Sequence, residues 1–278
     1  MGATNTMLLA MLVAGASSLA EAADLPMPPA PPIAVAVPVA DFGGWYLRGD
    51  VGVGAVQAGN FQSTIEPGYA NGAFVLPNGP IVPAFAAVGD SALFDFGFGY
   101  QFNSWLRGDL TGEYRSEATY RRGIATAWWT GGGVGTGYDS YSAGLSTALF
   151  MANGYVDIGT WRGVTPYIHA GVGLASHNFQ GLNDSGGAVA VAAHPTNLAW
   201  SLGAGLALSV TPNFKIDVGY RYIDMGGIES NRLEYCLNQP CFNERQWFHV
   251  ASHDIRLGFR YLFAEPVVVA AAPVTAKY

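Results

Sequence analysis

The chain has 278 residues, of which 50% are hydrophobic and only 12% are charged, and its formal net charge is −7. This composition excludes an intrinsically disordered chain, which would be polar and highly charged, and the 13 basic residues form no tract that would indicate nucleic-acid binding. Beyond the first 22 residues no uninterrupted apolar run reaches the roughly 20 residues of a membrane-spanning helix.

The first segment has the features of an export signal. Residues 7–16 form a short apolar run, MLLAMLVAGA, and Ala20, Glu21 and Ala22 follow in the small-x-small pattern of a cleavage site. These features predict a signal peptide over residues 1–22. Residues 23–40 contain six prolines, a composition typical of an extended segment, and we interpret them as a periplasmic linker.

The main signal in the rest of the chain is alternation with a period of two, because successive side chains of a strand face opposite sides. In chain order it predicts strands at about 45–55, 92–102, 105–115, 141–152, 165–174, 198–209, 214–222 and 254–263. In 214–222, for example, the even positions are Phe, Ile, Val, Tyr and Tyr, whereas the odd positions are Lys, Asp, Gly and Arg. None of the eight apolar faces carries an Asp, Glu, Lys or Arg.

These faces predict an all-β fold, a closed antiparallel up-and-down transmembrane β-barrel of about eight strands over residues 41–263. An Arg or Lys facing lipid near the bilayer centre costs about 2–4 kcal/mol, and only a closed sheet leaves no backbone group unpaired in hydrocarbon. Long and short connections alternate, which predicts four outer loops and places both termini in the periplasm. The alternative is a soluble barrel of lipocalin type, with its apolar face inward.

Four runs carry a family resemblance: GWYLRGDVGVG, YIHAGVGLA, NFKIDVGYRYIDMG and HDIRLGFRYLF. They resemble the small outer-membrane β-barrel proteins of alphaproteobacteria, the group of major surface antigens, porin-like proteins and hemin-binding proteins. The resemblance covers about residues 43–263 and implies a location in the outer membrane of a Gram-negative cell. That family usually ends its chain with the aromatic residue of the last strand, whereas here a C-terminal tail, residues 264–278, follows Phe263.

The inward faces of the predicted strands carry charges of both signs. The basic members are Arg48, Arg107, Arg115, Lys215, Arg221, Arg256 and Arg260, and the acidic members are Asp50, Asp95, Asp109, Glu113, Asp217 and Asp254. The interior of an eight-stranded barrel has room only for side chains, so we expect these groups to pair with one another in a lumen charge network. The sequence therefore predicts a narrow or occluded lumen.

Catalytic and metal chemistry are not indicated. Ser252, His253 and Asp254 are consecutive, but neighbours on a strand face opposite sides and form no triad. The five histidines show no metal-ligand spacing, so we expect no enzyme, no metal and no cofactor. His249 and His253 flank the last strand and could contact haem, although ordinary polar roles are the simpler interpretation.

The only two cysteines, Cys236 and Cys241, lie in the last long connection, in the run CLNQPC. Export to an oxidising compartment favours a disulfide over a metal pair or a redox centre. We therefore predict a Cys236–Cys241 bridge that stiffens an external loop.

Two functions remain open. The first is a structural and surface-interaction role in the outer membrane, with four exposed loops. The second is a porin-like channel for small solutes, and hemin binding or lipid A modification is less favoured. The expected partners are outer-membrane lipid and lipopolysaccharide, the barrel assembly machinery, and a host or envelope partner bound through the loops.

Overall fold

The structure is a computed structural model, and it describes residues 43–66, 68–70, 73–75, 82–130, 133–185, 187–235 and 242–263. The predicted signal peptide, proline-rich linker and C-terminal tail lie outside these residues, and so does the predicted Cys236–Cys241 bridge. No helix among the described residues is long and apolar enough to cross a membrane.

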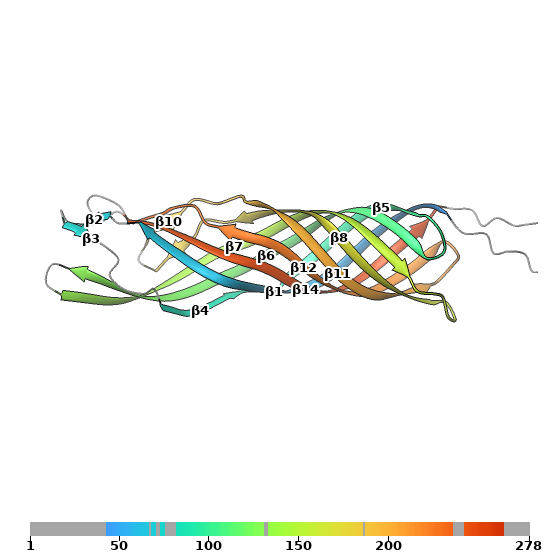
Figure 1. The fold of residues 1–278 in the computed structure, drawn as a ribbon, viewed down its shortest axis with the longest axis horizontal. Helices are drawn as coiled ribbons and strands as arrows, with labels where there is room; N and C mark the ends of the chain where they lie inside the picture. The colour runs from blue at the N-terminus through green and yellow to red at the C-terminus, as the bar shows by residue number, and fades with distance from the viewer. Residues whose placement is uncertain are drawn as a thin grey trace, which may run out of the picture. The chain divides into compact units, whose positions relative to one another are not determined.

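Eight long strands form a closed ring, in which each strand pairs antiparallel with two neighbours (Figure 1). They are β1 (Gly44–Glu66), β5 (Ser91–Gln101), β6 (Leu106–Thr130), β7 (Gly133–Asp157), β8 (Val164–Phe179), β11 (Thr196–Ser209), β12 (Phe214–Glu229) and β14 (Phe242–Leu262). Around the ring they follow their order in the chain, and the pairing of β14 with β1 closes it. The predicted all-β, antiparallel, eight-stranded barrel is confirmed.

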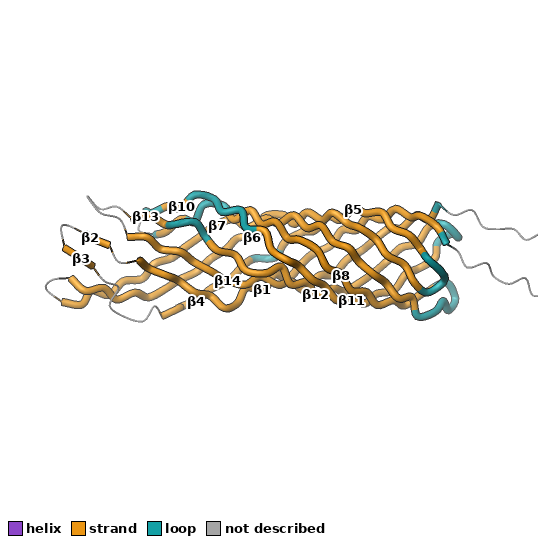
Figure 2. The backbone as a smooth tube through the Cα atoms, turned by 45° about the horizontal axis from the view of Figure 1, so that its top comes forward, coloured by secondary structure: helices purple, strands orange, loops and turns teal. Residues whose placement is uncertain are grey.

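The two ends of the ring differ (Figure 2). At the turn end, the short connections 102–105, 158–163 and 210–213 join neighbouring strands, and both Trp45 and Phe263 lie there. At the extended end, the connections carry the short strands β2 (Gly68–Ala70), β3 (Ala73–Val75), β4 (Val82–Val88), β9 (Asn183–Asp184), β10 (Val189–Ala190) and β13 (Leu233–Tyr235). The chain thus alternates between short turns and more elaborate connections.

Most strands run beyond their predicted bounds, mainly toward the extended end. β6 continues to Thr130 and β7 begins at Gly133, so the predicted long connection between them is largely strand. β14 begins at Phe242, well before the predicted start at 254. At the turn end β7 reaches Asp157, which shortens the predicted connection 153–164 to residues 158–163.

An apolar band surrounds the half of the barrel next to the turn end. Its outward side chains are large, apolar and exposed, and they include Trp45, Leu47, Val51, Phe94, Phe96, Phe98, Leu110, Tyr114, Phe150, Ile168, Val172, Leu174, Leu202, Leu206, Val218, Tyr220, Ile255, Leu257, Phe259 and Tyr261. The inward side chains at the same level are mostly polar or charged. This is the arrangement expected where lipid surrounds a barrel.

In the extended half, between the apolar band and the extended end, the two faces exchange character. On β14 Phe248 and Val250 point inward and are buried, whereas Arg245 points outward with 41% of its side chain exposed. On β6 Tyr120 is buried and Arg121 is exposed. The interior here is mostly apolar, with Arg122, Glu244 and Gln246 as buried polar exceptions. A mostly apolar interior with a polar exterior is the arrangement that water imposes, so the exchange marks the level at which lipid gives way to water.

Aromatic rings fill the interior of the extended half. The ring of Phe248 stacks on Tyr120 with centroids 4.8 Å apart, and Phe179 meets both rings edge-on. A bulge in β6 between Arg115 and Ala118 shifts the register of that strand. Because of this shift, Ala118 and Tyr120 follow Arg115 into the interior.

Candidate functional site in the barrel lumen

The structure places the thirteen predicted lumen residues in the half of the barrel inside the apolar band. Twelve of them are buried, and Lys215 is partly exposed. They arrive there because the period of two directs every second side chain of each strand inward. The acidic and basic groups form two sets, a central network and a group at the turn end.

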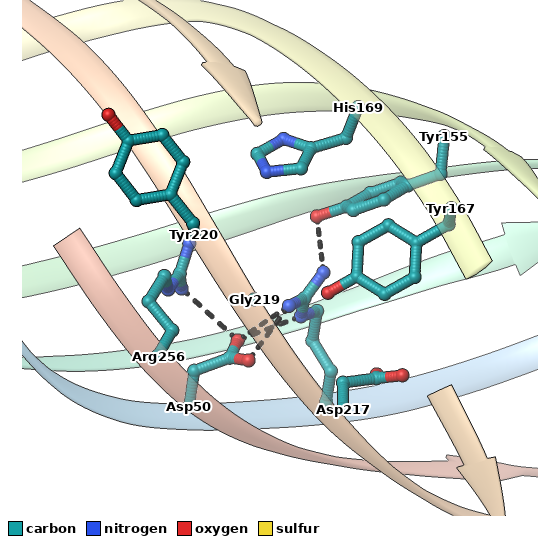
Figure 3. Close-up of a pocket in the computed structure, with 9 residues that line it drawn as sticks. Asp50, Tyr155, Tyr167, His169, Asp217, Gly219, Tyr220 and Arg256 are labelled. Atoms are coloured by element: carbon teal, nitrogen blue, oxygen red, sulfur yellow. Dashed lines mark hydrogen bonds and ion pairs between the residues drawn. The ribbon is translucent and has the colours of Figure 1, made fainter. Parts of the chain in front are cut away.

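In the central network, Arg48 and Arg256 share the carboxylate of Asp50. Arg48 lies 2.8 Å from Asp50 and 3.0 Å from Asp109, and Arg256 lies 3.2 Å from Asp50 and 2.6 Å from Asp95. The close-up in Figure 3 shows Arg256 beside Asp50, in keeping with the pairing of their strands β14 and β1. These contacts join β1, β5, β6 and β14, so each arginine ties strands that are distant in the sequence.

The second part of the central network is an alternating cycle of two arginines and two carboxylates. Arg221 lies 2.7 Å from Glu113 and 2.6 Å from Asp254, and Arg115 lies 2.9 Å from Glu113 and also pairs with Asp254. Ser252 adds a 2.7 Å hydrogen bond to Asp254. Since all four charged side chains are almost fully buried, losing one would leave a desolvated charge without its partner, which is strongly destabilising.

The turn-end group contains an acidic residue that the sequence analysis missed. Asp157 is buried and lies 3.2 Å from Arg107, and Asp217 lies 3.3 Å from Arg260. Within the described part of the chain Lys215 makes no ion pair. Asp157 was missed because the predicted strand ended at 152, although continued alternation through Tyr155 would have placed it inward.

Little free space is left among these side chains. Figure 3 shows Tyr155, Tyr167 and His169 gathered opposite Asp50 and Arg256. The enclosed cavity that they line has a volume of about 10 Å³, enough for one water molecule. Side chains therefore fill the described lumen in the polar half, as the aromatic rings do in the extended half.

The serine, histidine and aspartate at positions 252–254 do not form a catalytic arrangement. Ser252 and Asp254 point into the lumen, whereas His253 lies on the outer face and its ring contacts the Tyr220 hydroxyl at 2.6 Å. His249 lies on the same outer face, 2.9 Å from Asp224. Each of the two imidazole rings therefore has a protein partner on this face.

The described residues contain no group of three or more His, Cys, Asp or Glu side chains that could hold a metal ion. His177, near the extended end of β8, is buried, and both its ring nitrogens are engaged, one with the Thr147 hydroxyl at 2.9 Å and one with the Met225 carbonyl at 3.0 Å. His177 thus links β8 to its neighbour β7 and to β12, which lies beyond β11 in the ring.

A buried acid lies in the extended half, outside the apolar band. Glu244 accepts hydrogen bonds from the Tyr141 hydroxyl at 2.8 Å and from the Gln246 amide at 3.2 Å. Burial raises the pKa of the Glu244 carboxyl above its ordinary value of 4.5, and these hydrogen bonds offset only part of that effect. The folded barrel thus holds this proton more tightly than the unfolded chain does.

This shift predicts a pH dependence. The contribution of Glu244 to stability should be fully present below about pH 4.5 and should be lost as the pH rises through its raised folded-state pKa. Glu244→Gln should therefore be relatively more stable than the wild type at about pH 8 than at about pH 4. Thermal midpoints from heat-modified gel mobility would test this, and equal pH slopes for the two proteins would contradict it.

The amino-acid sequence of this chain is similar to those of known outer-membrane proteins. The family model described as outer membrane protein beta-barrel domain matches residues 6–263. The chain is 33% identical over 122 residues to the outer membrane protein PagN of Salmonella typhimurium, a match that covers 41% of this chain and about half, 48%, of PagN. It is 29% identical over 226 residues to an uncharacterized protein of Brucella suis biovar 1, covering 76% of this chain and 77% of that protein.

Among solved structures, the crystal structure of Neisserial surface protein A is similar, with a TM-score of 0.44 and 15% identity. The alignment covers 80% of this chain and all of the neisserial chain, 100%.

Proposed function

The chain belongs to the outer membrane protein beta-barrel domain family, and from this premise we propose that it is an occluded barrel with a structural and surface-interaction role. The observation that carries the proposal is the filled interior. Paired charges occupy the lumen inside the apolar band, aromatic rings occupy the extended half, and the enclosed cavity between Asp50 and His169 holds about 10 Å³. An interior of this kind supports the barrel wall and leaves the connections at the extended end for contacts.

The proposal includes an orientation. Short turns at one end and larger connections at the other are typical of outer-membrane barrels, whose turns face the periplasm. We therefore place the extended end outside the cell and both chain termini in the periplasm. In this orientation the extended half projects into the lipopolysaccharide layer, and the connections at its tip meet any host or envelope partner.

Planar-bilayer recording tests the occlusion. The refolded mature protein, with heat-modified gel mobility as the check of folding, should show no steady single-channel conductance at neutral pH. A sixteen-stranded porin, recorded in the same bilayer, serves as the positive control. Discrete, reproducible openings of the folded barrel would overturn the occluded interpretation.

A porin-like channel is the second candidate, and the charged lining of the lumen favours it. If channels were observed, Arg48 and Arg256 would line their narrowest part, because both contact Asp50 beside the small cavity. Neutralising Arg256 should then change the ion selectivity, which an occluded barrel cannot display.

A further inference from the structure

Among the described strands, β1 has a neighbour on only one side in the extended half. Up to Gly54 it pairs with β14 on one side and with β5 on the other. Beyond Gly54 the pairing with β14 continues to Glu66, whereas the ladder with β5 stops at Ser91. β4, which precedes β5 in the chain, stays paired with β6 and forms no ladder with β1 within the described residues. Toward the extended end β1 and β4 lie apart (Figure 1), and we call residues 55–64 of β1 the free edge.

The burial of the side chains agrees with the lack of a neighbour on this side. Val56 and Phe61 of the free edge pack against the apolar core of the extended half, but they are only partly buried. On β14, the paired neighbour of β1, Phe248 and Val250 face the same core with 0% and 1% exposed. A strand that covered the free edge would therefore place apolar side chains on its inward face.

A buried arginine of β6 reaches the free edge from inside the barrel. Arg122 is 2% exposed, and its guanidinium donates a 3.1 Å hydrogen bond to the backbone carbonyl of Gln62 and lies 5.6 Å from the ring centroid of Phe61. Among the described residues no carboxylate pairs with it, and its Nε is buried without a hydrogen-bond partner. Because a buried charge without a counter-charge is costly, this position favours a partner that brings a carboxylate.

The two strands that border the opening differ in how well they can accept another strand. β4 is seven residues long and carries Pro83, which has no N–H, and both features protect an edge from pairing. The free edge of β1 bulges once, between Gly59 and Gln62, but it contains no proline and no charged residue. Pairing with another chain is therefore favoured at β1. A second copy inserted in the same direction would present its β1 in parallel, which is the less stable pairing, so a different protein is the better occupant.

We propose that the free edge of β1 binds an extended segment of another protein as an added antiparallel strand. The segment alternates apolar and polar residues, with its apolar side chains against Val56 and Phe61 and one inward acid paired with Arg122. In this mode of recognition the backbone hydrogen bonds supply affinity and the alternate side chains supply specificity. The inference rests on the proposed surface-interaction role, because it needs the extended half to lie outside the cell.

The probe is a synthetic peptide in which threonine and valine alternate and a central valine is replaced by glutamate. Its binding to the refolded mature protein would be followed by fluorescence anisotropy of the labelled peptide and by hydrogen exchange of the protein. The peptide should bind saturably and should slow the exchange of amides in residues 55–64. The same peptide with glutamine in place of glutamate should bind about ten-fold more weakly, as expected from losing one hydrogen bond between charged groups.

Arg122→Met should remove the difference between the two peptides. Arg121→Met, which removes the exposed arginine beside it on the outer face of β6, is the matched control and should preserve the difference. If Arg122→Met does not fold, the comparison of the two peptides on the wild type still tests the pairing with a buried cation.

Three results would overturn the proposal: no saturable binding, equal binding of the two peptides by the wild type, or slow exchange of the free-edge amides before any peptide is added. The last result would mean that the chain's own residues already pair with this edge. None of these results changes the expected absence of conductance in planar bilayers, so a failure of strand addition is distinguishable from a failure of the occluded barrel.

Discussion

Replacing Arg221 with Met is expected to lower the free energy of unfolding by about 3–5 kcal/mol, because it leaves two buried carboxylates with one arginine fewer. Arg221 is 1% exposed and lies 2.7 Å from Glu113 and 2.6 Å from Asp254. Equilibrium urea unfolding in lipid vesicles, followed by tryptophan fluorescence, would measure the loss. Arg121→Met, which removes an exposed arginine from the outer face of β6, should change the value by no more than about 0.5 kcal/mol.

A second variant separates the loss of the charge pair from the loss of packing. In Glu113→Gln combined with Arg221→Met, one carboxylate and one guanidinium disappear together, so fewer charges remain unpaired. The double variant should be more stable than the sum of the two single losses implies. Additive losses would mean that Glu113 and Arg221 contribute independently, contrary to the cycle of contacts with Arg115 and Asp254.

Replacing Phe248 with Ala is expected to lower stability by about 3–5 kcal/mol, with the effect concentrated in the extended half. The Phe248 ring is fully buried and packs against Tyr120, Phe179 and Phe61, with centroids 4.8, 5.5 and 5.8 Å away. Removing it leaves a cavity at the centre of this core. Hydrogen exchange should show faster exchange for amides of β6 and β14 in the extended half, while those within the apolar band stay protected.

Phe259→Ala is the control for this experiment. Phe259 lies on the same strand but faces outward in the apolar band, where 44% of the residue is exposed. Its replacement should leave exchange in the extended half unchanged. Uniform loss of protection along β14 in Phe248→Ala would show that the two halves of the barrel unfold as one unit, and would contradict a separate core.

The eight strands could be predicted from sequence because lipid outside and charge inside give a strong alternation. The clearest case is 214–222, where the structure places Lys215, Asp217 and Arg221 on the lumen side. The extended half could not be predicted in the same way. There the apolar residues, such as Tyr120 and Phe248, face inward, so a search for outward apolar side chains stops at the edge of the lipid band.

β-Bulges are a second reason why the alternation in the sequence does not predict the extended half. The register of β6 shifts between Arg115 and Ala118, and that of β12 shifts between Asp224 and Gly226. Each shift exchanges odd and even positions, so a pattern followed through it assigns every later side chain to the wrong face. The partners inside the lumen were equally inaccessible to sequence reasoning: Arg48 bonds Asp109 on β6, and only the closed ring brings them within 3.0 Å.

The exchange of faces along β6 and β14 also fixes how deeply the protein sits in the bilayer. If the barrel slid in the direction of its turn end, Arg121 and Arg245 would enter hydrocarbon, and if it slid in the direction of its extended end, Phe94, Phe150 and Ile255 would be drawn into water. Either displacement costs free energy on every strand whose outward side chains are apolar in the band and polar in the extended half. The side chains of the barrel therefore favour one depth in the bilayer.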